Sequence, residues 1–168
     1  MSLPDPEKLL LLAESLISSG GPEPGQENLR RAISSAYYAV FHAVLTDVAD
    51  NFQGRDARQS PNYSLLCRSV DHRRARQLCD DLKKDKLPEK YQKYLPAGGL
   101  GPELTQFSEQ FGVLQDLRTS ADYDPQFHIN GSDTTLAVDI GRTAIRNFAS
   151  ATHEQRAAFA SLLLFPPR

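Results

Sequence analysis

Apolar residues recur at steps of three and four along most of the chain, the spacing that lines one face of an α-helix. The clearest stripe runs through residues 27–51, which contain neither glycine nor proline. Its apolar positions are Leu29, Ile33, Ala36, Val40, Val44 and Val48, with Phe41 and Leu45 beside them. A helix of about 24 residues spans about 36 Å, the height of a helical bundle. We therefore expect this helix to be central, with Ile33 and Val40 buried.

Weaker stripes predict further helices. A first helix starts near Asp5 and ends at the serines and glycines of residues 18–21. Others are expected over about 71–84, 103–121, from the turn at 130–133 to residue 151, and from 153 onwards, with a short piece near 64–69. Loops are expected over residues 20–25, 52–64 and most of 85–102, which are rich in Gly and Pro. Inward positions are expected to include Leu12 in the first helix and Leu136 after the turn.

No stretch alternates with period two, so no strand is predicted. The pattern indicates an all-α protein, an antiparallel helical bundle of four or five main helices forming one domain over residues 1–168. The length of 168 residues and the apolar fraction of 40% suit a single folded core.

The composition and the motifs of the chain argue against several classes of protein. No apolar run is long enough to cross a membrane, and the first residues are acidic where a signal peptide would be basic. We therefore expect a cytoplasmic protein without a membrane partner. The two cysteines and four histidines show no metal-ligand spacing, and there is no phosphate-binding glycine loop, so neither a metal nor a cofactor is predicted.

Charge is uneven although the net charge is only −2. Residues 55–93 hold eleven of the nineteen Lys and Arg residues but six of the twenty-one Asp and Glu residues. The densest point contains Arg73, Arg74 and Arg76. One interpretation is a solvated helix face. The other is a local patch that binds phosphate backbones.

A row of polar side chains follows the central helix. Arg31, Ser35, Tyr38 and His42 are separated by four, three and four residues, which places them on one stripe beside the apolar one. A guanidinium, a hydroxyl, a phenol and an imidazole in one row are suited to an anion or a nucleotide. The alternative is that the tyrosine and the histidine are boundary core residues satisfied by neighbouring helices.

A second group lies at the end of the helix over 103–121. Arg118 falls on the apolar stripe and needs an acceptor, which Asp122 can supply four residues later. Tyr123 follows directly. We expect Arg118 and Asp122 to pair and to contact the central helix near Tyr38 or His42. A buried pair of this kind is worth about 3–5 kcal/mol when one partner is removed. The pair is either purely structural or part of a site.

Together, two segments resemble the HEPN-domain family, the higher eukaryote and prokaryote nucleotide-binding domains. They are Arg-Ala-Ile-Ser-Ser-Ala-Tyr-Tyr-Ala-Val-Phe-His over 31–42 and Arg-Thr-Ser-Ala-Asp-Tyr over 118–123. The resemblance implies an antiparallel bundle, often a homodimer, that binds RNA or nucleotide. Many members are ribonuclease toxins of bacterial toxin–antitoxin or defence systems, often encoded beside a minimal nucleotidyltransferase partner. Active members cleave RNA without a metal, using an arginine and a histidine separated by a short spacer.

This chain lacks that spacing. After Arg118 the next histidine is His128, with nine residues between them, and the other pair, Arg68 and His72, has three. The sequence therefore favours a bundle that binds RNA, nucleotide or a partner protein. The alternatives are a metal-independent endoribonuclease that uses one of those two pairs, and a purely structural interaction module.

Overall fold

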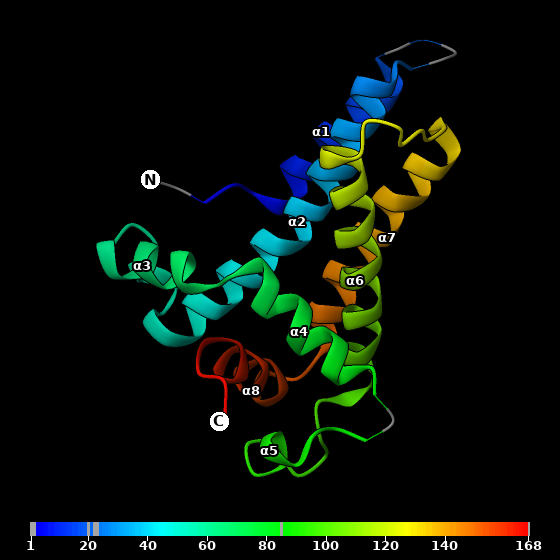
Figure 1. The fold of residues 1–168 in the computed structure, drawn as a ribbon. Coiled ribbons are helices and arrows are strands. Elements are labelled where there is room, and N and C mark those ends of the chain that lie inside the picture. Colours follow the sequence, from blue (N-terminus) through cyan, green and yellow to red (C-terminus); the bar gives the residue numbers. More distant parts are fainter. Residues whose placement is uncertain (1–2, 20, 22–23, 85, 168) are drawn as a thin grey trace.

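The computed structural model describes residues 3–19, 21, 24–84 and 86–167, and every regular element in these ranges is a helix. Figure 1 shows long helices packed side by side, with shorter ones at one end of the bundle. The α-helices are α1 (Pro6–Ser18), α2 (Gln26–Gln53), α3 (Pro61–Ser69), α4 (His72–Leu82), α5 (Glu89–Gln92), α6 (Gly101–Tyr123), α7 (Gly131–Ser150) and α8 (His153–Leu164). A single 3-10 turn covers Arg55–Ala57. The predicted all-α bundle is confirmed.

Helix α2 is the centre of the fold. It packs against α1, α6 and α7 along its length and also touches α3 and α8. Ile33 and Val40 have no exposed surface, as the apolar stripe predicted. Helix α2 is buried on more than one face and contributes to both hydrophobic clusters of the described residues, and its polar row lies at the edge of the core.

The described chain has more helices than the predicted four or five main ones, because the short piece predicted near 64–69 is a helix that begins earlier, at Pro61, and a further short helix lies in the segment 85–102 expected to be mostly loop. Helix α3 begins at Pro61, where a first turn tolerates proline, and the Ser60 side chain accepts a hydrogen bond from the backbone N–H of Tyr63. Helix α5 is one turn long and lies within the segment 85–102. Of the predicted linker over 20–25, residues 20, 22 and 23 lie outside the described residues.

Two predicted inward leucines are in fact exposed. Leu12 and Leu136 are 46% and 58% exposed. Helix α1 buries Leu10 and Ala13 instead, and the contact face of α7 includes the small residues Ala137, Gly141 and Ala144. A Cβ added to Gly141 would lie 3.4 Å from Leu10 and 3.5 Å from the carbonyl oxygen of Ala36. Close approach of three helices selects small side chains there, a requirement that a search for large apolar residues overlooks.

Helix ends follow the local sequence. Asp5, Asn130 and Thr152 each accept a backbone N–H at the start of a helix. Helix α6 ends at Tyr123, directly before Asp124 and Pro125, as predicted. Within the described ranges, none of the helices has the length and apolar character needed to cross a membrane.

Candidate functional site

Polar and aromatic side chains from three helices meet around one arginine. We define the Arg118 cluster as Tyr37, Tyr38 and His42 of α2, His72 of α4, and Arg118, Asp122 and Tyr123 of α6. The cluster lies beside the middle of α2, where the last turns of α6 pack against that helix and where His72, the first residue of α4, contacts Tyr37 and Phe41.

Arg118 is held by contacts on several sides. Its Nη2 donates hydrogen bonds to the hydroxyl of Tyr38 at 2.9 Å and to that of Tyr123 at 3.4 Å. Its Nε lies 2.7 Å from Oδ2 of Asp122, but the N–H is not aimed at the carboxylate, so this contact is an ion pair without a hydrogen bond. The Arg118–Asp122 pair and its contact with Tyr38 are therefore confirmed.

Asp122 in turn connects α6 to α2. Its Oδ1 accepts a hydrogen bond from the hydroxyl of Ser34 at 2.5 Å. The guanidinium carbon of Arg118 also lies 5.2 to 5.9 Å from the ring centres of three tyrosines, in cation–π range. The side chain of Arg118 is 19% exposed, so the guanidinium is partly screened from water while retaining access to it.

His72 is fixed from the other side of the cluster. Its Nδ1 lies 2.7 Å from the hydroxyl of the fully buried Tyr37, and its ring stacks on Phe41 with centres 3.8 Å apart. The backbone carbonyl of His72 accepts a hydrogen bond from the amide of Gln115 on α6. The imidazole therefore has a defined position beside Arg118.

The environment keeps both histidines of the cluster neutral near neutral pH. Burial lowers the pKa of His72 below its usual value, and the positive charge of Arg118 lowers it further, while Asp71 raises it. Burial also lowers the pKa of His42, with a further contribution from His72. The site thus combines the charged guanidinium of Arg118 with the neutral imidazoles of His72 and His42.

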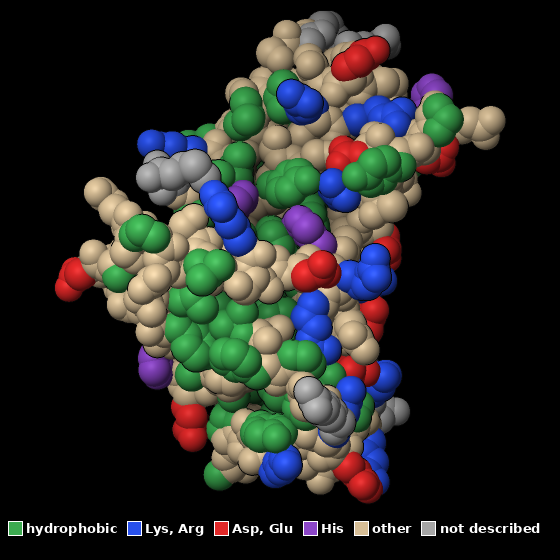
Figure 2. All heavy atoms as spheres, turned by 60° about the vertical axis from the view of Figure 1, so that its left-hand side comes forward, with side chains coloured by type: hydrophobic (Ala, Val, Ile, Leu, Met, Phe, Trp, Pro, Cys, Tyr) green, Lys and Arg blue, Asp and Glu red, His purple; other side chains and the backbone are tan. Residues whose placement is uncertain are grey.

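A cavity of about 230 Å³ adjoins the cluster. It is lined by Pro4, Leu9, Arg31, Ser34, Ser35, Tyr38 and His42, and we call it the Arg31 pocket. The polar row predicted from helical spacing therefore shares one cavity. Tyr38 and His42 belong to both pocket and cluster. On the face seen in Figure 2, histidine side chains reach the surface near the centre, among hydrophobic side chains and Lys or Arg side chains.

The arginines of the basic segment have different environments. Arg76 forms ion pairs with Asp80 and Asp116, and Arg74 donates to the carbonyl oxygen of Leu162. Both side chains therefore connect helices of the bundle. Arg73 is exposed, and no hydrogen bond or ion pair of its side chain is found among the described residues. Only part of the predicted basic patch is available to a ligand.

The two arginine–histidine pairs considered for cleavage, Arg118 with His128 and Arg68 with His72, are not brought together as the family's motif would require. His128 is exposed, and its ring contacts the carbonyl oxygen of Gln126, with no hydrogen bond or ring contact to Arg118 in the described ranges. Arg68 belongs to α3 and His72 to α4, so the two residues do not lie on successive turns of one helix. Val70 and Asp71 are extended and separate the two helices.

Sequence reasoning missed the association of His72 with Arg118. The two residues lie 46 positions apart on different helices, and both approach the Tyr37–Tyr38 pair. The available signal was Asp71, which caps α4 by accepting the backbone N–H of Arg73 and of Arg74 and so fixes His72 as the first residue of that helix.

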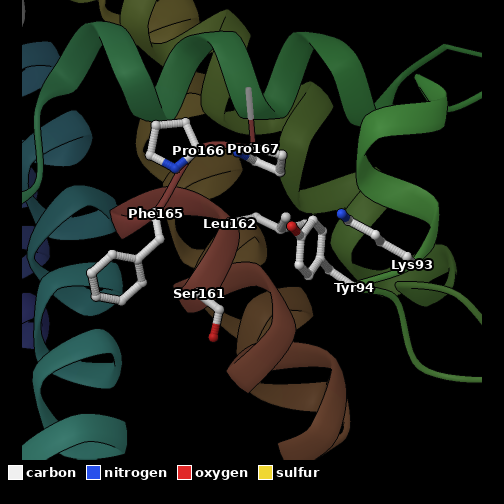
Figure 3. A pocket seen from close by; sticks show the side chains of 7 residues that line it. All are labelled: Lys93, Tyr94, Ser161, Leu162, Phe165, Pro166 and Pro167. Carbon is white, nitrogen blue, oxygen red and sulfur yellow. The ribbon is translucent and has the colours of Figure 1, made fainter.

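Another cavity lies beside α8. It has a volume of about 580 Å³ and is lined by Lys93, Tyr94, Ser161, Leu162, Phe165, Pro166 and Pro167. Figure 3 shows Lys93 and Tyr94 on one side of it and Phe165 on the other. Lys93 lies 4.9 Å from the ring centre of Tyr94. Its lining is largely apolar and brings no acid–base pair together, so the Arg118 cluster is the better candidate for chemistry.

Among the described residues, no three His, Cys, Asp or Glu side chains gather so as to hold a metal ion. Comparisons with protein-family models, with curated proteins and with solved structures found no match. The function of the protein is therefore inferred from the geometry of the cluster and from the resemblance of its sequence to HEPN domains.

Proposed function

We propose that this chain binds RNA through its phosphate groups at the Arg118 cluster and the adjoining Arg31 pocket, as the resemblance to HEPN domains implies. The observation that carries the proposal is the position of Arg118, whose guanidinium is held by tyrosines beside His72 with 19% of the side chain exposed. A preorganised guanidinium is the usual protein partner of a phosphate.

The surroundings of Arg118 suit a polynucleotide. Tyr123 is 68% exposed and offers an aromatic face on which a base can stack. Arg31 is exposed at the mouth of the neighbouring pocket, where it is available to a second phosphate. Because Asp122 already balances part of the charge of Arg118, we expect moderate affinity and a salt dependence corresponding to about two phosphate contacts.

The test is a titration of a fluorescent single-stranded oligouridine of about 10 nucleotides. Arg118→Gln should weaken binding by at least about tenfold, because it removes a charge-assisted contact. Arg142→Gln is the matched control. Arg142 of α7 pairs with Glu7 and Glu14 of α1 and belongs neither to the Arg118 cluster nor to the lining of the Arg31 pocket. Equal binding by wild type and Arg118→Gln would contradict the proposal.

Metal-independent RNA cleavage is the second candidate, because a histidine and an arginine approach the same pair of tyrosines. In this reaction the 2′-hydroxyl attacks the adjacent phosphorus and the bond to the 5′-oxygen of the next nucleotide breaks, which gives a 2′,3′-cyclic phosphate and a free 5′-hydroxyl. A histidine takes the proton of the attacking hydroxyl or gives one to the leaving 5′-oxygen, and an arginine stabilises the charge on the phosphorane. The pair would be Arg118 and His72, in place of the two pairs that the sequence left open. Cleavage of mixed RNA in a chelator should be lost in Arg118→Ala and His72→Ala but kept in His128→Ala.

A further inference from the structure

The hydrogen bond between Tyr37 and His72 joins two residues that have no other side-chain hydrogen bond within the described ranges. Tyr37 has no exposed surface, and its hydroxyl lies 2.7 Å from Nδ1 of the imidazole. A buried phenol O–H left without an acceptor costs free energy. The one acceptor that the structure offers this hydroxyl is Nδ1 of His72.

This requirement selects one form of the histidine. If Nδ1 carried the proton, it would donate to the phenol oxygen and leave the phenol O–H unsatisfied. Burial raises the pKa of Tyr37 well above its usual value, so the phenol keeps its proton. In the neutral imidazole the remaining proton then belongs to Nε2.

The outward nitrogen is accessible. Nε2 of His72 has no hydrogen-bond partner among the described residues and is not one of the fully buried polar atoms, so it reaches the surface. The stack on Phe41 fixes the plane of the ring. A ring held in this way presents an N–H at a defined place in the Arg118 cluster, next to the Tyr37 and Tyr38 rings that Arg118 also approaches.

We propose that Tyr37 is a positioning residue, which holds His72 as the Nε2–H tautomer so that this N–H donates to a phosphate oxygen of the RNA bound at Arg118. This inference rests on the proposed function. The tautomer also distinguishes the two candidate functions. A nitrogen Nε2 that already carries a proton cannot act as a general base in cleavage, but it can donate a hydrogen bond to a bound anion.

The tautomer is measured by NMR on the full chain labelled with ¹⁵N-histidine, at about pH 8, where an ordinary imidazole is neutral. His72 is assigned through His72→Gln. Wild type should show a protonated Nε2 and a hydrogen-bonded, unprotonated Nδ1. A proton on Nδ1 of His72 in the wild-type protein would overturn the proposal without the need for any variant.

Two variants test the role of the hydroxyl. Tyr37→Phe should move the Nδ1 resonance of His72 toward that of a free imidazole and weaken oligouridine binding about three- to tenfold. Tyr63→Phe is the matched control, because Tyr63 is equally buried and donates to Asp50 away from the cluster, and it should change neither quantity.

The NMR and binding measurements distinguish the positioning role of Tyr37 from RNA binding at Arg118. An Nδ1 resonance unmoved in Tyr37→Phe, or unchanged RNA affinity in that variant, would refute the positioning role while leaving Arg118 as the phosphate partner. Absence of RNA binding by wild type would refute the proposed function, and with it the donation to phosphate, even where the spectra show the Nε2–H tautomer.

Discussion

At the residue scale, Arg118 combines a structural role with a proposed binding role. Its ion pair with Asp122 was predictable from the helical spacing of the two residues, and its hydrogen bond to Tyr38 was predictable from the need of a half-buried guanidinium for acceptors. The loss of about 3–5 kcal/mol expected when one partner of a buried pair is removed is too large for this pair, however, because 29% of the Asp122 side chain remains exposed.

We expect Arg118→Ala to lower the free energy of unfolding by about 1–2 kcal/mol, since water can solvate the carboxylate that is left behind. Urea denaturation of wild type and variant measures this value. Asp122→Asn is the control, because it removes the ion pair while keeping an acceptor for the hydroxyl of Ser34. A loss above about 4 kcal/mol would show that Asp122 is desolvated without Arg118.

The stability of the protein should fall as the pH is lowered from about 7 to about 5. The pKa of His72 and that of His42 are lower in the folded chain than the usual 6.5, so the unfolded chain binds more protons in this range. The groups facing His72 are Tyr37, His42, Arg118 and Asp71. The stabilisation is fully present above about pH 7 and is lost as the pH falls through 6.5 toward the folded-state values.

Urea denaturation at several pH values measures this dependence. His72→Gln should flatten it, whereas His128→Gln on the exposed loop should leave it unchanged. An equally steep dependence in His72→Gln would contradict the assignment of the effect to this residue.

At the element scale, α2 determines both the core and the site. Its apolar stripe is buried against three long helices, and its polar row lies along the edge of that core and lines the Arg31 pocket. Both properties could be predicted from spacing within one helix, because neighbours on a helix face are fixed by geometry alone.

Truncation of a core residue of α2 should be costly. Ile33→Ala is expected to lower the free energy of unfolding by about 2–4 kcal/mol, because the residue is fully buried and the cavity cannot close. The exposed Leu136→Ala should change it by less than about 0.5 kcal/mol. Similar losses for both variants in thermal or urea denaturation would contradict the observed packing of α2 and α7.

At the scale of the whole molecule, the site exists because the first residue of α4 and the last turns of α6 meet the same stretch of α2, at Tyr37 and Tyr38. Helical spacing identified Arg31, Tyr38, His42 and Arg118 one helix at a time. It could not pair His72 with Tyr37, which is 35 positions away on another helix, because contacts between helices depend on packing angles and on small residues such as Gly141. For the same reason, the sequence offered His128, the next histidine along the chain, as a partner for Arg118 and gave no indication of His72.

The central claim is that RNA phosphate binds at the Arg118 cluster, and the most direct test is to follow the histidines while RNA is added. Oligouridine titrated into the ¹⁵N-histidine-labelled chain should shift the resonances of His72 and His42 and leave that of His153, which lies at the start of α8, unmoved. Those shifts should disappear in Arg118→Gln. Binding that moves the resonance of His128 or His153 while leaving His72 and His42 unchanged would place the RNA elsewhere and contradict the account.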